Sequence, residues 1–178
     1  MAITRIGPNQ SINLASNITG TLPVGNGGSG RTVVTGNVLQ IVTATTTSQV
    51  NNNTTSYTDT NLTASITPSA TSSKIYIIVN QINKLQEASA SGGSVIKLLR
   101  DSTTIYGGDI SYENYLKAGG ATDVQRYDRT NLNFLDSPSS TSSITYKTQA
   151  RCDTAGDIIS CQPEASKSSI TLMEIAGW

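Results

Sequence analysis

The chain has 178 residues, with 12 basic, 12 acidic and no histidine side chains. A formal net charge of zero and only 13% charged residues exclude the basic stripe that nucleic acid requires and the polybasic patch that binds anionic membranes. Without histidine, the chain lacks the usual general base near neutral pH, the usual zinc ligand and every Ser–His pair. Ser and Thr account for 48 residues, which favours short strands and turns over helices.

The sequence contains no phosphate-binding loop, dinucleotide fingerprint or serine-hydrolase elbow. It has no spaced Asp-x-Asp-x-Asp-Gly loop for calcium, so we expect no cofactor and no metal. No apolar run is long enough to cross a bilayer, and the N-terminal segment lacks a secretory signal. We therefore expect no membrane insertion, and synthesis in the cytoplasm of the producing cell.

The first 36 residues show neither a strand period nor a helix period, and Gly, Pro and Asn interrupt them repeatedly. We predict that residues 1–36 are an extended attachment arm with a Gly-rich linker, and that residues 37–178 form a head domain. An arm this poor in apolar residues orders only on a partner surface. The expected attachment residues are the scattered apolar ones: Ile3, Ile6, Ile12, Leu14, Ile18 and Leu22.

Eight short segments of the head domain alternate in polarity or are rich in β-branched residues. They cover residues 38–42, 57–66, 74–82, 95–99, 103–106, 131–135, 144–152 and 170–176. Joined by Ser, Gly, Asn and Pro turns, they predict an all-β, eight-stranded antiparallel jelly-roll sandwich. An immunoglobulin-like sandwich is the alternative, but its usual core Trp is missing, because the only Trp is residue 178.

Two segments lack a strand pattern. Residues 84–91 are compatible with one helical turn, and residues 107–129 read as a long insertion, which in a compact domain is usually functional or disordered. Tyrosine offers a flat apolar face and a hydroxyl group, which both sugars and protein partners use. We predict receptor or partner binding by four tyrosines in or beside the insertion, namely Tyr106, Tyr112, Tyr115 and Tyr127. The alternative is that these rings pack the insertion onto the sandwich.

Residues 75–82 are apolar on both faces of the predicted strand, and the last strand shows the same excess. A sandwich core covers only one face of each sheet, so the second face needs another cover. Obligate interfaces resemble a core cut in half, and closed symmetry is the usual solution. We predict a homotrimer whose interface contains Tyr76, Ile78, Met173 and Ile175.

Cys152 and Cys161 flank a predicted turn, and a hairpin would bring them within disulfide reach. Cytoplasmic synthesis favours reduced thiols instead, and Cys152 occupies a core position of its strand. For catalysis, the single candidate is a carboxylate pair, Asp109 and Glu113, and nothing in the sequence places the two across a cleft. We therefore predict that the chain is not an enzyme.

Residues 17–30, Asn-Ile-Thr-Gly-Thr-Leu-Pro-Val-Gly-Asn-Gly-Gly-Ser-Gly, resemble a linker that recurs in tail fibres of tailed bacteriophages, where it usually ends Asn-Gly-Gly-Thr-Gly. The head domain resembles one found in small structural proteins of aquatic phages. The segments that carry this second resemblance are residues 57–68, 72–75, 99–103, 134–138, 145–147 and 170–175.

The resemblance implies a virion protein, a homotrimer whose jelly-roll heads pack about a threefold axis, and it implies no catalytic residue. Because only 16 residues precede the linker, we expect a stub fibre, a head fibre or a capsid decoration rather than a long fibre. The first hypothesis is a surface appendage, anchored to tail or capsid proteins by residues 1–36, whose head binds a host-surface receptor or glycan. The second is a capsid decoration or cement protein. The distant third is a small carbohydrate-active enzyme.

Overall fold

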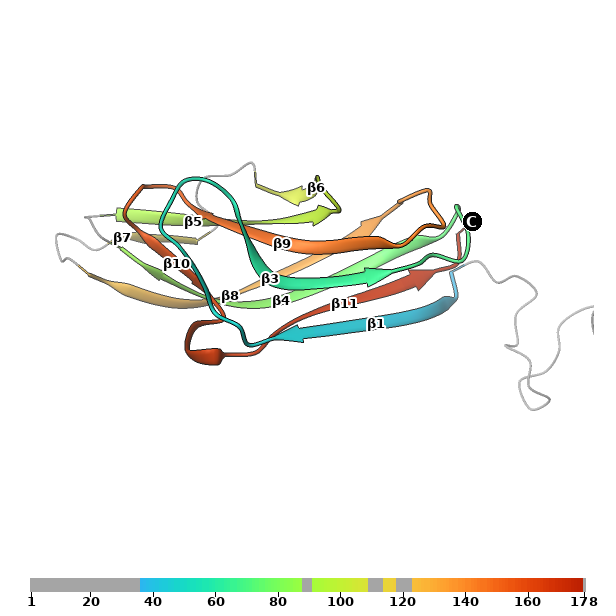
Figure 1. The fold of residues 1–178 in the computed structure, drawn as a ribbon, viewed down its shortest axis with the longest axis horizontal. Coiled ribbons are helices and arrows are strands. Elements are labelled where there is room, and N and C mark those ends of the chain that lie inside the picture. The colour runs from blue at the N-terminus through green and yellow to red at the C-terminus, as the bar shows by residue number, and fades with distance from the viewer. Residues whose placement is uncertain (1–35, 88–90, 109–113, 118–122, 178) are drawn as a thin grey trace, which may run out of the picture. The chain divides into compact units, whose positions relative to one another are not determined.

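The computed structural model describes residues 36–87, 91–108, 114–117 and 123–177, which form a sandwich of two antiparallel sheets (Figure 1). Sheet A contains β1 (Val38–Thr46), β2 (Val50–Asn52), β4 (Lys74–Gln86), β8 (Gln125–Asp136), β10 (Ile158–Cys161) and β11 (Ser168–Ile175). Sheet B contains β3 (Thr58–Ile66), β5 (Ser91–Arg100), β6 (Thr103–Gly107), β7 (Asn114–Lys117) and β9 (Ile144–Cys152). One turn of 3₁₀ helix, η2 (Pro163–Ala165), separates β10 from β11.

The eleven strands of the described residues occupy the positions of eight long strands, counted in chain order. Three of these positions are each filled by two short strands, namely β1 with β2, β6 with β7, and β10 with β11. β10 and β11 pair with successive parts of one edge of β4, and β2 and β1 pair with β10 and β11 in turn. In the same way, β6 and β7 pair with successive parts of one edge of β5. The first position pairs with the eighth, the second with the seventh, the third with the sixth and the fourth with the fifth. This nested pairing confirms the predicted jelly roll.

Burial follows the period of two expected for strands that cover one face of a core. β9 has the predicted bounds, and its predicted inward residues, Ile144, Tyr146, Ala150 and Cys152, are all buried. In β4, Ile75, Ile77 and Val79 are fully buried between the sheets, each contributing about 2 kcal/mol by removal from water. The core cluster draws on both sheets, so the two layers stabilise each other.

The predicted helical turn at residues 84–91 is wrong. Residues 84–86 continue β4, because β8 and β10 pair with this end of the strand on its two edges. The sequence pattern hid this, since Lys84 and Gln86 alternate with a fully buried Leu85 only over a short stretch. The predicted insertion at residues 107–129 is also too long, because β7 lies within it and β8 begins at Gln125.

Hydrogen-bonded polar groups also cross the core. Tyr146 Oη donates to Asp136 Oδ2 over 2.7 Å, and Arg100 Nη1 lies 2.9 Å from Asp136 Oδ1, which ties β9 and β5 of sheet B to β8 of sheet A. Near the middle of the sandwich, Thr148 Oγ1 donates to Gln81 Oε1 over 2.8 Å. Because buried polar groups are costly unless they are paired, these contacts fix how the two sheets align.

Candidate functional site

The outer face of sheet A carries an apolar row that crosses four strands. Ile41 of β1 lies opposite Met173 of β11, Met173 lies opposite Tyr76 of β4, and Tyr76 lies opposite Leu135 of β8. Directly opposed residues of an antiparallel pair project to the same face, with their Cβ atoms about 5 Å apart. We call these four residues the sheet A apolar row. It is assembled from segments that are far apart in the sequence.

Both ends of the sheet A apolar row are open to solvent, since Ile41 is 59% exposed and Leu135 is 44% exposed. Val38, opposite Ile175, extends the apolar surface and is 53% exposed. The residues predicted at a trimer interface, Tyr76, Ile78, Met173 and Ile175, all lie on this one outer face. Sequence reasoning missed Ile41 and Leu135, which it had assigned only to strands.

Farther along β4, the same outer face becomes polar. Arg129 Nη1 donates to Asn80 Oδ1 over 2.8 Å, and Tyr127 Oη donates to Glu164 Oε1 over 2.6 Å. The change in polarity confines the apolar surface to the end of sheet A where β1 begins and β11 ends. At that end, Gly36 N donates to Ala176 O over 2.8 Å, so the first described residue of the chain lies beside the apolar surface.

The three described tyrosines of the predicted binding cluster lie on different elements. Tyr106 is at the end of β6, with its ring 5.5 Å from that of Phe134, which itself packs against the core. Tyr115 lies on β7 of sheet B, whereas Tyr127 lies on β8 of sheet A. The contact of Tyr106 with Phe134 agrees with the packing alternative for that ring.

The remaining predicted residues lie outside the described part of the chain. These are Tyr112, the carboxylate pair Asp109 and Glu113, and the arm residues Ile3, Ile6, Ile12, Leu14, Ile18 and Leu22.

On the outer face of sheet B, a β-bulge opens a small cleft that sequence reasoning missed. The register moves from Asp59 opposite Gln149 to Thr63 opposite Lys147, so β3 advances four residues while β9 advances two. Asn61, in the bulge, has a left-handed φ of 63°. The cleft has a volume of about 160 Å³ and is lined by Asp59, Asn61, Leu62, Thr63, Lys147 and Thr148. The available signal was Asn61 itself, because Asn is depleted in strands and tolerates left-handed φ.

The rim of this cleft carries an ion pair between Lys147 and Asp59. Lys147 Nζ lies 2.8 Å from Asp59 Oδ2, and Gln149 Nε2 donates to Asp59 Oδ1 over 2.7 Å. Partial burial alone would raise the pKa of Asp59, but the hydrogen bonds from Lys147 and Gln149 outweigh it, so this pKa lies below its ordinary value. Asp59 is therefore an acceptor at neutral pH, next to a charged donor.

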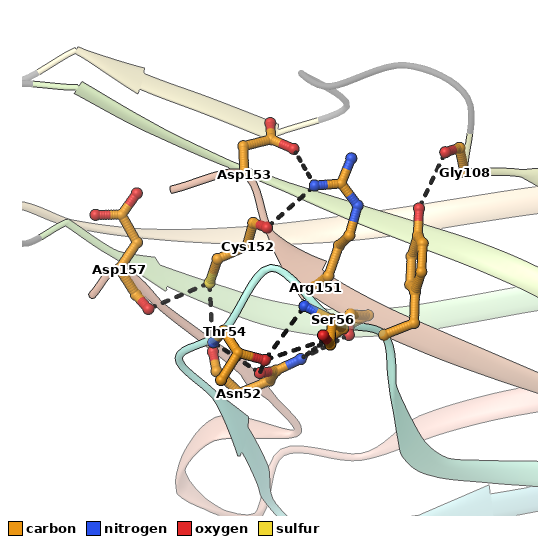
Figure 2. Close-up of polar contacts among 10 residues, drawn as sticks. Asn52, Thr54, Ser56, Gly108, Arg151, Cys152, Asp153 and Asp157 are labelled. Carbon is orange, nitrogen blue, oxygen red and sulfur yellow. Dashed lines mark hydrogen bonds and ion pairs between the residues drawn. The ribbon is translucent and has the colours of Figure 1, made fainter. Parts of the chain in front are cut away.

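Tyr57 directly precedes β3. It lies two residues before Asp59, which lines the cleft, and on the same outer face of sheet B. Its hydroxyl donates to Gly108 O over 3.0 Å, and Lys97 Nζ lies 3.9 Å from the centroid of its ring. The Arg151 guanidinium carbon lies 5.3 Å from the same centroid, and Arg151 Nη1 pairs with Asp153 Oδ1 at 2.9 Å (Figure 2). Cation–π contacts of this kind hold the ring in one orientation.

The turn before Tyr57 is held by the buried amide of Asn52 (Figure 2). Its Nδ2 group donates to Ser56 O over 2.7 Å and to Ala150 O over 3.0 Å, while Oδ1 accepts from Thr54 N over 2.9 Å. A side chain that satisfies a turn in this way replaces the missing ladder bonds. Asn52 thus fixes the entry of the chain into β3 and, with it, the position of Tyr57.

Both cysteines are free and buried, as predicted from cytoplasmic synthesis. Cys152 Sγ lies 3.3 Å from the carbonyl oxygens of Asn52 and Asp157 (Figure 2). Burial raises the pKa of Cys152 to about 11 and that of Cys161 to about 12. Because the thiolate is the reactive form, neither residue is suited to nucleophilic chemistry.

These features define an all-β jelly-roll domain with one partly apolar outer face and one polar outer face that carries a cleft. Among the described residues, no helix is both long and apolar enough to cross a membrane. No family model and no curated protein matches the chain.

Solved structures show only distant similarity. A viral particle of infectious bursal disease virus matches at 12% identity and a TM-score of 0.40, over 79% of this chain and 37% of that chain. The VP2 protein of the same virus matches at 12% identity and a TM-score of 0.38, over 79% and 37%. Dimeric latent PorU from Porphyromonas gingivalis matches at 11% identity and a TM-score of 0.33, over 81% and 14%. The chain thus spans 37% of the length of these viral chains, and TM-scores this low carry no inference about function.

Proposed function

We propose that this chain is a structural protein of a bacteriophage virion, a homotrimeric surface appendage of the short fibre or spike type. Residues 1–36 anchor it to tail or capsid proteins, and the jelly-roll head faces outward to a host-surface receptor. The support comes from phage-like sequence segments between residues 17 and 175, which surround and build a jelly-roll domain. The proposal assigns no catalytic step to the chain.

The observation that carries the trimer is the sheet A apolar row. Monomeric proteins rarely leave contiguous apolar patches open to water, and such patches usually mark interaction sites. A row that spans the full width of sheet A gives a subunit a long, flat contact surface. Closed symmetry lets identical copies cover it, and three copies about an axis meet the expectation from the phage resemblance.

Light scattering on the full-length protein tests this assembly. We expect a mass of three chains of 18.7 kDa each at micromolar concentration. A single-chain mass under those conditions would falsify the trimer and, with it, the interface role of the outer face of sheet A.

The anchoring role of residues 1–36 is supported by their composition. Arg5 is the only charged residue before Arg31, so docking depends on backbone hydrogen bonds and small apolar pockets rather than on long-range attraction. An arm that orders on binding adds an entropic cost, which makes one arm weak. Three arms on one trimer offset this cost through avidity.

A capsid decoration or cement protein is the alternative function. The exposed apolar end of sheet A, beside Gly36, would suit contact with neighbouring capsid subunits equally well. Copy number separates the two functions, because an appendage of the tail occurs a few times per particle and a decoration occurs many times. Loss of particle stability without the protein would favour the decoration.

A further inference from the structure

We propose that the cleft at the β3 bulge binds one sugar ring of a host-surface polysaccharide. The inference rests on the proposed function, because it assigns a ligand class and a place to the receptor role of the head. It locates recognition on sheet B, away from the sheet A apolar row, so assembly and ligand binding use different faces.

The cleft results from the β-bulge in β3. Four steps along β3 against two along β9 separate the strands between Asp59 and Thr63, and the cleft forms in that gap. Bulges re-aim side chains and are common beside binding sites. The left-handed φ of Asn61 holds the bulge in a conformation that most side chains resist. Asn is one of the few residue types that tolerate this conformation, and here it places a polar amide at the rim of the cleft.

The size of the cleft restricts the ligand. Sites for drug-sized molecules have volumes of several hundred cubic ångströms, whereas this cleft measures about 160 Å³. It therefore accommodates a single small ring rather than a peptide side-chain cluster or a nucleotide.

The chemistry of the rim favours hydroxyl groups over ions. The Asp59 carboxylate accepts hydrogen bonds, the Lys147 ammonium donates them, and the Asn61 amide does both. Because Asp59 and Lys147 are paired at 2.8 Å, their charges cancel and the cleft attracts neither anions nor cations strongly. Adjacent hydroxyl groups of a pyranose need a donor and an acceptor side by side, which this pair supplies.

Tyr57 lies beside the cleft but is not one of the residues that line it. It lies two residues before Asp59, and alternation along the strand puts both side chains on the outer face of sheet B. Gly108 O and Lys97 already hold the ring, so little side-chain entropy is lost on binding. The next unit of a polysaccharide, rather than the sugar in the cleft, would pack its apolar C–H face against the part of the ring that Lys97 and Arg151 leave uncovered.

Saturation-transfer NMR on the full-length protein tests the inference, with glucose, galactose, mannose, N-acetylglucosamine and rhamnose as separate probes. A contact with one small ring gives a Kd in the millimolar range, so each probe is used at about 50 mM. We expect at least one probe to bind. We expect Asp59→Ala and Asn61→Gly each to weaken that binding by about tenfold or more. Asn61→Gly keeps the left-handed backbone while removing the amide.

Asp128→Ala is the matched control. Asp128 is also a solvent-accessible carboxylate paired with a cation, Arg126 at 2.9 Å, but it is half-buried and lies on β8 of sheet A. This variant should bind the probe like the wild type, and thermal melting confirms that all three variants are folded. The inference is overturned if none of the five sugars binds, if Asp59→Ala and Asn61→Gly bind normally, or if Asp128→Ala loses binding as well. None of these outcomes bears on virion incorporation, which tests the proposed function separately.

Discussion

Tyr146 of β9 donates its hydroxyl proton to Asp136 of β8 through the interior of the sandwich, over 2.7 Å. Tyr146 is fully buried, and the same Asp136 carboxylate also binds the Arg100 guanidinium of β5. A buried carboxylate is stable only when its oxygens are paired. The contact therefore makes the alignment of sheet A on sheet B specific in a way that apolar packing alone does not.

Tyr146→Phe should lower the free energy of unfolding by about 1–2 kcal/mol, because one hydrogen bond to a buried charged group is lost while Arg100 still pairs with Asp136. Arg100→Met should cost more, about 3 kcal/mol, since it removes the only cation that contacts this carboxylate among the described residues. Urea unfolding monitored by circular dichroism measures both values. Equal stability of Tyr146→Phe and the wild type would show that the contact contributes nothing.

Glu174 should make stability depend on pH in the acidic range. Burial alone would raise its pKa, but hydrogen bonds from Ser69, Ser73 and Gln40, at 2.6–2.7 Å, outweigh this and lower the pKa to about 2, from an ordinary value of 4.5. A lowered folded-state pKa stabilises the protein above the ordinary pKa, and this contribution is lost as the pH falls toward 2. At neutral pH, we expect Glu174→Gln to be less stable than the wild type.

Urea unfolding at neutral pH and near pH 3 measures this dependence. The difference in unfolding free energy between Glu174→Gln and the wild type should shrink as the pH falls, because the wild type loses the contribution that the variant never had. A constant difference across the two conditions would mean that the carboxylate charge is not what stabilises this corner of the sandwich.

Ile41→Glu should dissociate the proposed trimer. Ile41 is 59% exposed, so the charge does not disturb the monomer, but it cannot be buried in an apolar interface without a large cost. The matched control is Ser169→Glu, which adds the same charge to the same outer face at its polar end, opposite Asn80. Light scattering should give one chain mass for Ile41→Glu and three for Ser169→Glu. Trimers of both variants would place the interface elsewhere.

Cys152 and Cys161 should resist labelling in the folded protein. With pKa values of about 11 and 12, both remain protonated at neutral pH, and neither is open to solvent. We expect a thiol reagent such as Ellman's to count no reactive thiol in native protein and two in urea. Rapid labelling of one thiol before unfolding would indicate local opening of that part of the core.

Removal of residues 1–36 should leave a folded trimeric head that fails to join the virion. Among the described residues, the head loses one backbone hydrogen bond, from Gly36 N to Ala176 O. It keeps its hydrophobic core. Incorporation is measured by comparing purified particles from infections that supply the full-length or the truncated protein. Normal incorporation of the truncated protein, or its failure to fold, would contradict the attachment role.

Local pattern was sufficient for most of the fold. Ile144–Cys152 was predicted with its bounds and its inward face, because the period of two is a property of consecutive residues. The order of eight strands and the missing core Trp together favoured a jelly roll, and strand pairing confirms it. The ends of β4 and β8 were not predictable from local pattern. Each strand is as long as its pairing with the other allows, and that pairing joins segments far apart in the sequence.

The sheet A apolar row and the cleft also depend partly on local sequence pattern and partly on tertiary structure. The sequence alone identified Tyr76 and Met173 as apolar residues on the face of their strands that points away from the core. A strand with two apolar faces needs a second packing partner beyond the core of its own sandwich. Only the tertiary structure joined these two residues to Ile41 and Leu135, since cross-strand register, which depends on the whole sandwich, decides which residues lie opposite each other. The cleft at Asn61 depended on register as well: a bulge exists only relative to the partner strand, and β9 follows β3 by about 80 residues along the chain.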